Sequence, residues 1–110
     1  MTEENILAEN PNVHAGHRER IREQYLRDGM DGFSDVQVLE LLLYYTNKVK
    51  DTNETAHRLL DAFGSLKGVF EARTEQLIKV NGMGKESAIL VNLMLGLFNR
   101  YNKCLAMEKE

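Results

Sequence analysis

The chain has few of the residues that cross-link or stiffen a fold: no tryptophan, one proline and one cysteine among 110 residues. The single cysteine, Cys104, excludes an internal disulfide bond, and a reducing cytoplasm is the default for such a protein. The very apolar stretch at residues 87–98 holds only 12 residues, which is too short to span a bilayer. No signal peptide is indicated, since residues 2–12 are acidic and polar. We therefore expect a cytoplasmic protein without a membrane segment.

An excess of positive charge is also missing. The chain carries 14 Lys+Arg and 17 Asp+Glu, which gives a formal net charge of −3 at pH 7. Proteins dedicated to nucleic acid are often basic, so any affinity for DNA is expected to be local and weak. A hydrophobic content of 43% with 28% charged residues is ordinary for a soluble globular protein, and 110 residues fit one domain.

Apolar residues recur at helical spacing, and no run of alternating β-branched residues occurs, which predicts an all-α fold of about six helices. A flexible leader at 1–13, one helical domain at 14–102 and a tail at 103–110 are expected. The predicted helices cover about residues 14–28, 34–45, 51–63, a short segment after 65, 74–80 and 85–102. Their predicted caps are Ser34 with Gln37, Asp51 with Glu54, Ser65 and Thr74, and Gly64 is the predicted end of the third.

The most informative stretch is Gly82-Met83-Gly84, which lies between two apolar segments. Glycine reaches positive φ without steric cost, so Gly82 is expected to stop one helix and Gly84 to open the next. Met83 is expected to anchor the turn in the core. This pattern is typical of a helix-hairpin-helix, in which main-chain amides at a helix start hold a backbone phosphate.

Two neighbours would assist such a site: Lys85 would add a positive charge and Ser87 a hydroxyl donor. Ala88 is expected to be small because the two helices cross closely there. The alternative interpretation is an ordinary helical hairpin that uses glycine only for its turn. Glu86 favours that alternative, because an acid in the first turn can itself satisfy the helix dipole.

Residues 59–91 also suggest an internal pseudo-repeat, with the loop at 46–53 in place of a first hairpin. Lys48, Lys50 and Thr52 would carry a second phosphate site there through their side chains, although a solvated polar loop is the plainer interpretation. The densest basic stretch contains Arg18 and Arg22. It either extends a phosphate track or forms a solvated helix face with local ion pairs.

Catalytic constellations are missing from the sequence. His14 and His17 share a helix face but have no third ligand nearby, so no metal site and no cofactor are expected. A DNA glycosylase is excluded, because no aspartate follows Gly84. The chain is therefore predicted not to be an enzyme.

The last predicted helix is apolar nearly all round, which requires cover on nearly every side. A small domain does not supply that cover alone. We expect a partner on this helix, either a second copy or further protein.

Four motifs, in order, resemble the N-terminal domain of RadC-type DNA repair proteins over about residues 14–102. They are Gly16-His17-Arg18-Glu19-Arg20, Gly32-Phe33-Ser34-Asp35 with the following leucine-rich helix, residues 63–70 (Phe-Gly-Ser-Leu-Lys-Gly-Val-Phe), and the glycine hairpin. Residues 63–91 are also similar to the tandem helix-hairpin-helix domain of the excision nuclease UvrC. The resemblance departs from the family near residue 47, where many members have a glycine-containing loop.

In the RadC family this domain precedes a JAMM-type metalloprotease-like domain, whose His-x-His zinc motif is missing from this sequence. The resemblance implies a non-catalytic module that binds DNA weakly and without sequence preference. The alternative is an adaptor whose last helix docks a JAMM-type domain or a second copy.

Overall fold

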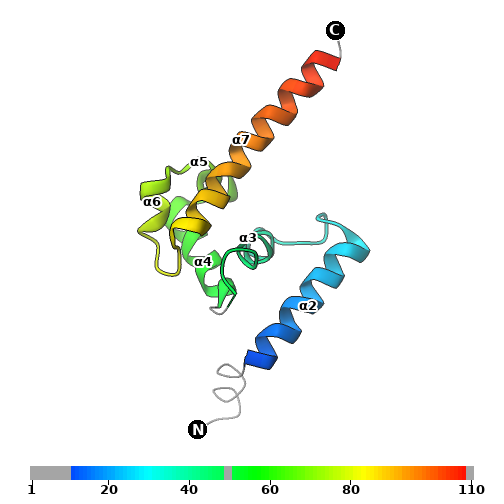
Figure 1. The fold of residues 1–110 in the computed structure, drawn as a ribbon, viewed down its shortest axis with the longest axis vertical. Coiled ribbons are helices and arrows are strands. Elements are labelled where there is room, and N and C mark those ends of the chain that lie inside the picture. The colour runs from blue at the N-terminus through cyan, green and yellow to red at the C-terminus, as the bar shows by residue number, and fades with distance from the viewer. Residues whose placement is uncertain (1–10, 49–50, 109–110) are drawn as a thin grey trace. The chain divides into compact units, whose positions relative to one another are not determined.

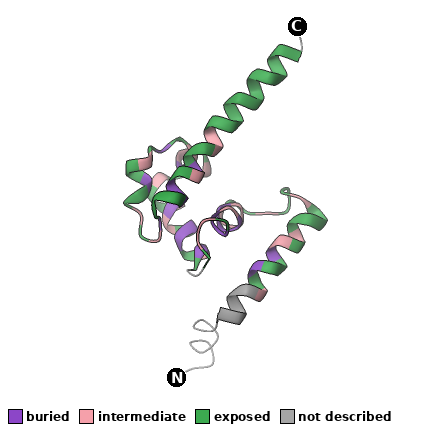
Figure 2. Cartoon of the chain, viewed as in Figure 1, coloured by how far each residue is buried: buried purple, intermediate pink, exposed green. Residues whose placement is uncertain are grey.

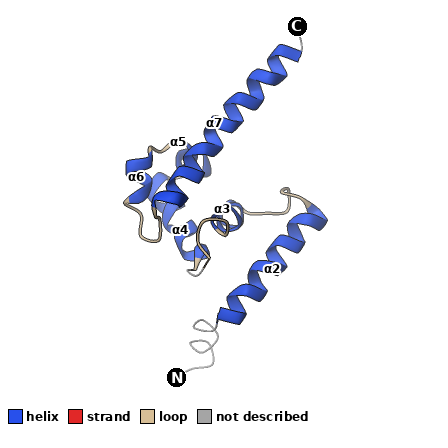
Figure 3. Ribbon diagram, viewed as in Figure 1, coloured by secondary structure: helices blue, strands red, loops and turns tan. Residues whose placement is uncertain are grey.

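The computed structural model describes residues 11–48 and 51–108, and within them the chain forms six helices and no strand (Figures 1 and 3). The helices are α2 (Pro11–Asp28), α3 (Asp35–Leu43), α4 (Thr52–Phe63), α5 (Leu66–Glu71), α6 (Thr74–Ile78) and α7 (Lys85–Glu108). The predicted all-α class is confirmed. None of the described helices is both long enough and apolar enough to traverse a bilayer.

The chain divides into two compact units, Met1–Ala56 and His57–Glu110, with the boundary inside α4. In the first unit α2 packs against α3. Its core combines Ile21 from α2 with Leu41 and Tyr44, and Phe33 packs against this cluster from the connecting loop. Leu26 of α2 does not contribute to this core, since it is 81% exposed.

In the second unit α5 and α6 both pack against the first half of α7. Val69, Leu77 and Val91 are fully buried, one from each of these helices. Phe70 of α5 meets Phe98 of α7 edge to face, with ring centroids 5.4 Å apart. Figure 2 shows the consequence: burial is confined to the part of α7 beside α5 and α6, and the remainder of the helix is exposed.

Most of the predicted caps are confirmed. The Ser34 hydroxyl accepts from the Gln37 amide at 3.2 Å while the Gln37 side chain accepts from the Ser34 amide at 2.9 Å. Asp51 accepts from the Asn53 amide at 3.0 Å. Ser65 Oγ accepts from the Gly68 amide at 2.9 Å, and Gly64 ends α4 with φ of 83°.

Several predicted boundaries differ from the structure, and α3 and α6 each end two residues early, at Leu43 and Ile78. α2 begins at Pro11 rather than His14, since proline suits a first helical position. Arg73, not Thr74, is the N-cap of α6, because the Gln76 side chain accepts from the Arg73 amide at 3.1 Å. α7 continues to Glu108, past the predicted end near Asn102.

Candidate phosphate-binding hairpin

The hairpin between α6 and α7 is built on a tight turn. The Met83 amide donates to the Val80 carbonyl at 3.0 Å, and Gly82 within this turn has φ of 98°. The predicted positive φ is confirmed, but the predicted role as helix stop is corrected: α6 ends at Ile78, with Lys79 as its C-cap. Gly82 therefore reverses the chain after the helix has already ended.

Met83 and Ala88 hold the hairpin to the core as predicted. Met83 is 6% exposed and Ala88 is fully buried. α6 and α7 pack against each other on either side of the turn. The side chains at the hairpin's centre therefore face inward, and the backbone of the turn is left on the outside.

Gly84 is the residue from which α7 starts, since its carbonyl accepts the Ala88 amide at 3.0 Å. The amides of a first helical turn have no acceptor within the helix. Among the described hydrogen bonds, none has the amide of Gly84, Lys85 or Glu86 as donor. A Cβ at Gly84 meets no described atom within 4 Å, so the approach to these amides is open. The geometry offers a set of unsatisfied donors at the positive end of a helix of 24 residues.

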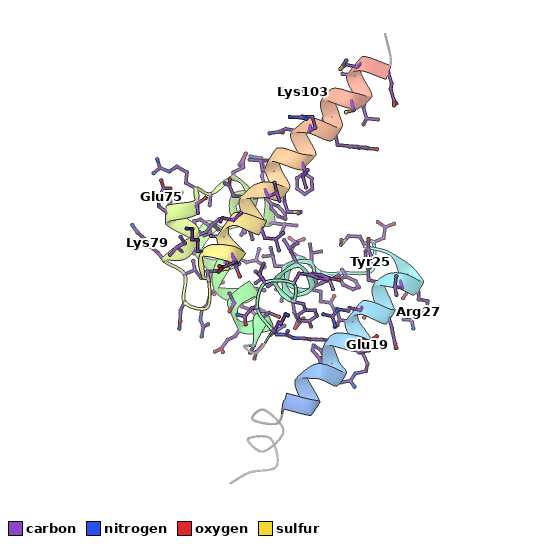
Figure 4. The ribbon with its side chains drawn as sticks, viewed as in Figure 1. Glu19, Tyr25, Arg27, Glu75, Lys79 and Lys103 are labelled. Atoms are coloured by element: carbon purple, nitrogen blue, oxygen red, sulfur yellow. The ribbon has the colours of Figure 1, made fainter. Side chains whose placement is uncertain are left out.

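Three cations surround this turn. Lys79 and Lys85 are exposed, and Figure 4 shows the Lys79 side chain projecting outward beyond α6. Arg58 of α4 donates from its guanidinium to the Asn81 carbonyl at 3.3 Å, which ties α4 to the residue before Gly82. Sequence reasoning missed Arg58, because 23 residues separate it from Asn81 and no local pattern signals the contact. One exposed acid, Glu86, opposes this positive charge.

The other predicted site residues differ in their exposure to solvent. Ser87 is only 4% exposed and interacts with other groups of the protein. Its hydroxyl is therefore not presented at the surface as the predicted donor to phosphate. Lys48 is exposed in the loop that follows α3. Lys50 lies outside the described residues.

Arg18 does not belong to an exposed basic track on α2 as predicted, because it is only 8% exposed. Its guanidinium carbon lies 4.6 Å from the centroid of the Tyr44 ring, a cation–π contact. Arg22 lies 5.5 Å from Tyr44 and 5.6 Å from the more exposed Tyr45, with Glu19 3.9 Å away. These arginines therefore stabilise the first unit by covering its tyrosines, which sequence periodicity alone does not show.

Two further polar groups are buried beside these rings. Glu40 is 3% exposed, and its carboxylate lies 3.4 Å from His17 Nε2. The Tyr44 hydroxyl is buried beside the Glu40 carboxylate, but it makes no well-formed hydrogen bond within the described residues. Burial, followed by the negative charge of Glu40, raises the pKa of Tyr44 well above its ordinary value. The phenol is therefore neutral throughout the physiological range.

Removal of this hydroxyl is expected to be harmless or stabilising. Tyr44→Phe keeps the ring on which the arginines stack and deletes a buried polar atom without a partner, so the free energy of unfolding should stay equal or rise by up to about 1 kcal/mol. Urea denaturation followed by circular dichroism measures this. A loss of more than about 1 kcal/mol would show that the hydroxyl is hydrogen-bonded after all.

These observations define a class of protein domain. It is all-helical over the described residues, and it carries a glycine hairpin that is anchored in the core and followed by helix-start amides without an acceptor. The chain belongs to the UPF0758 family, whose N-terminal domain model matches residues 14–89. It is 46% identical over 79 residues to UPF0758 protein FN0909 of Fusobacterium nucleatum, which covers 72% of this chain and 34% of that protein. It is 35% identical over 83 residues to UPF0758 protein COPRO5265_1522 of Coprothermobacter proteolyticus, covering 76% and 35%.

The matched stretch spans about a third of the length of these two curated relatives. The match agrees with the resemblance to the N-terminal region of RadC-type proteins at the level of the family, and the names of the relatives state no ligand. No solved structure matches this chain.

Proposed function

We propose that the chain is a non-catalytic, sequence-independent DNA-binding module that holds backbone phosphate at the hairpin between α6 and α7. The observation that carries the proposal is the row of unsatisfied amides at Gly84, Lys85 and Glu86, open to solvent because position 84 has no side chain. A phosphate oxygen suits such donors, since both the amide hydrogens and the helix dipole favour an anion.

The position of the turn supports the same proposal. Met83 and Ala88 fix the backbone from below, so the amides are preorganised and need not be ordered on binding. Lys79 and Lys85 are exposed before and after the turn, and their ammonium groups would contact neighbouring phosphates. No base-reading side chain is required for such a contact, which explains why sequence preference is not expected.

The charge of the chain sets the strength of binding. With a net charge of −3 and Glu86 beside the amides, the hairpin supplies only a few favourable contacts. We expect dissociation constants no tighter than about 10 µM at moderate salt, within the range of non-specific DNA binding. Further DNA-binding sites linked to this chain would raise the overall affinity for DNA by avidity.

Lys85→Glu is the variant that tests the hairpin. It should weaken binding of a labelled duplex by roughly tenfold at about 50 mM salt and reduce the salt slope by about one phosphate contact. Fluorescence anisotropy at about 50 and 200 mM salt, with single-stranded, duplex and branched DNA and an RNA strand, measures both effects.

The matched control is Lys103→Glu, because Lys103 is also an exposed lysine of α7 and the change in net charge is identical. It lies 18 residues further along the helix, which is about 27 Å of axial rise. The proposal requires that Lys103→Glu bind nearly as well as the parent. If the two variants lose DNA affinity equally, the loss comes from the change in net charge alone. If a folded Lys85→Glu variant binds DNA as tightly as the parent, the hairpin does not contact DNA.

A further inference from the structure

The side chain of Arg58 reaches from α4 to the hairpin between α6 and α7. Its guanidinium donates to the Asn81 carbonyl at 3.3 Å. Leu59, the next residue of α4, is fully buried, so packing fixes the turn of the helix that carries Arg58. The hydrogen bond therefore joins a firmly held helix to one atom of the hairpin, the oxygen of the peptide between Asn81 and Gly82.

The turn of the hairpin is a type II β-turn over residues 80–83. The Met83 amide donates to the Val80 carbonyl at 3.0 Å, which closes a four-residue turn. Of the two central residues, Gly82 has a φ of 98°, whereas the φ of Asn81 is not positive. This combination defines type II, because the φ values of the central residues are both negative in type I and both positive in type I′.

The residues of this turn do not by themselves choose between type I and type II. Both types keep the same closing hydrogen bond, and they differ mainly in the central peptide, which is turned over in one relative to the other. Glycine adopts positive and negative φ about equally readily, so Gly82 suits either type. Since type I is the commonest turn in proteins, a further contact is needed to hold the type II form.

Arg58 supplies a contact that distinguishes the two types. Within the described residues, its guanidinium is the one donor to the Asn81 carbonyl, and this carbonyl belongs to the peptide that turns over. In a type I turn the oxygen would face away from the guanidinium, and the hydrogen bond would be lost. A hydrogen bond from a charged donor is stronger than one between neutral groups, so Arg58 favours type II.

The orientation of this peptide also decides where the Gly82 amide points. The peptide is trans, so its C=O and N–H groups point in opposite directions. While Arg58 holds the Asn81 oxygen, the Gly82 N–H therefore faces away from the guanidinium, and it has no acceptor within the described residues. If the peptide turned over, a carbonyl oxygen would replace this donor, and an oxygen repels phosphate.

We propose that Arg58 is the positioning residue of the hairpin, because its guanidinium selects the turn in which the Gly82 N–H is available as a further donor to phosphate. The choice of ligand rests on the DNA-binding function proposed above, whereas the turn itself forms without DNA. Without the guanidinium, part of the population adopts the type I turn. DNA affinity should then fall by about threefold to tenfold.

Nuclear Overhauser spectroscopy of the full 110-residue chain tests the turn without DNA. The Asn81 Hα and the Gly82 amide hydrogen lie close together in a type II turn and further apart in a type I turn. Arg58→Met keeps a long side chain but has no donor, so the cross-peak between these two hydrogens should weaken clearly. Arg58→Lys keeps a cationic donor and should restore most of it. An unchanged cross-peak in Arg58→Met overturns the proposal.

Fluorescence anisotropy with a labelled duplex at about 50 mM salt tests the consequence for binding. Arg58→Met should bind about threefold to tenfold more weakly than the parent, and Arg58→Lys should recover most of the loss. The matched control is Arg100→Met, since Arg100 is an exposed arginine of α7 and the change in net charge is the same. This control should bind nearly as well as the parent. Circular dichroism shows that each variant is folded.

The two measurements separate this inference from the proposed function. If the parent does not bind DNA but Arg58→Met weakens the cross-peak, the proposed function fails, and the role of Arg58 in the turn is supported. If the parent binds and Arg58→Met loses no more affinity than Arg100→Met, Arg58 does not position a donor to DNA, and the inference is overturned. A loss of binding with an unchanged cross-peak also overturns it, because Arg58 would then contact DNA directly.

Discussion

Gly68→Ala is expected to lower the free energy of unfolding by about 3 kcal/mol. A Cβ built at Gly68 falls closer to the Phe63 carbonyl oxygen than real Cβ atoms come to any atom, and it also crowds Ser65 Oγ at 3.3 Å. The obstacle is backbone, so it cannot turn aside. The Gly68 amide is already held by Ser65 at 2.9 Å, which fixes the turn between α4 and α5.

Urea denaturation by circular dichroism measures this loss, and Gly96→Ala provides the matched control. Gly96 also lies within a helix, but a Cβ there has no described neighbour within 4 Å. At low protein concentration Gly96→Ala should raise the free energy of unfolding by up to about 1 kcal/mol, as helix propensity dictates. If Gly68→Ala unfolds within about 1 kcal/mol of the parent, the turn is looser than the structure indicates.

Gly82→Val should lower the free energy of unfolding by about 2–3 kcal/mol and abolish DNA binding in the fraction that remains folded. The cause is the φ of 98° at Gly82, which a β-branched residue adopts only under strain. If valine forces a different turn, the backbone shifts and the amides that follow at Gly84 and Lys85 no longer converge. Stability and binding should therefore fall together.

Gly82→Asn is the control for this effect, because asparagine tolerates positive φ far better than valine does. Chemical denaturation should rank the free energies of unfolding as parent, then Asn, then Val, and DNA binding should follow the same order. Equal losses for Asn and Val would mean that the cost arises from side-chain bulk at the turn rather than from backbone conformation.

The local features of the fold were predictable from sequence because their causes lie within four residues. The capping box at Ser34 and Gln37 and the glycine stop at Gly64 are of this kind, and both are confirmed. The length of α7 was not predictable from the same rules. No glycine or proline ends it near Asn102, and its polar residues there gave no stop signal beyond the loss of apolar periodicity.

Long-range contacts explain where the site predictions diverged from the structure. The sequence pattern predicts Arg18 to be a surface cation, since a short window of residues does not show that its guanidinium packs on Tyr44, 26 positions later. Arg58 was overlooked for the converse reason, because its contact with Asn81 joins residues far apart in the sequence. The hairpin glycines were found because their spacing and the buried residue between them are a local pattern.

The most direct test of the account is to follow each backbone amide while DNA is added. In a ¹H–¹⁵N spectrum of the full chain, titration with a short duplex should shift the amides of Gly84, Lys85 and Glu86 first and most, with smaller changes at Lys79. Added salt should reverse these shifts, because the contacts are with phosphate. Shifts confined to α2 or to the exposed half of α7, with the hairpin amides unmoved, would contradict the proposal that this turn holds the backbone.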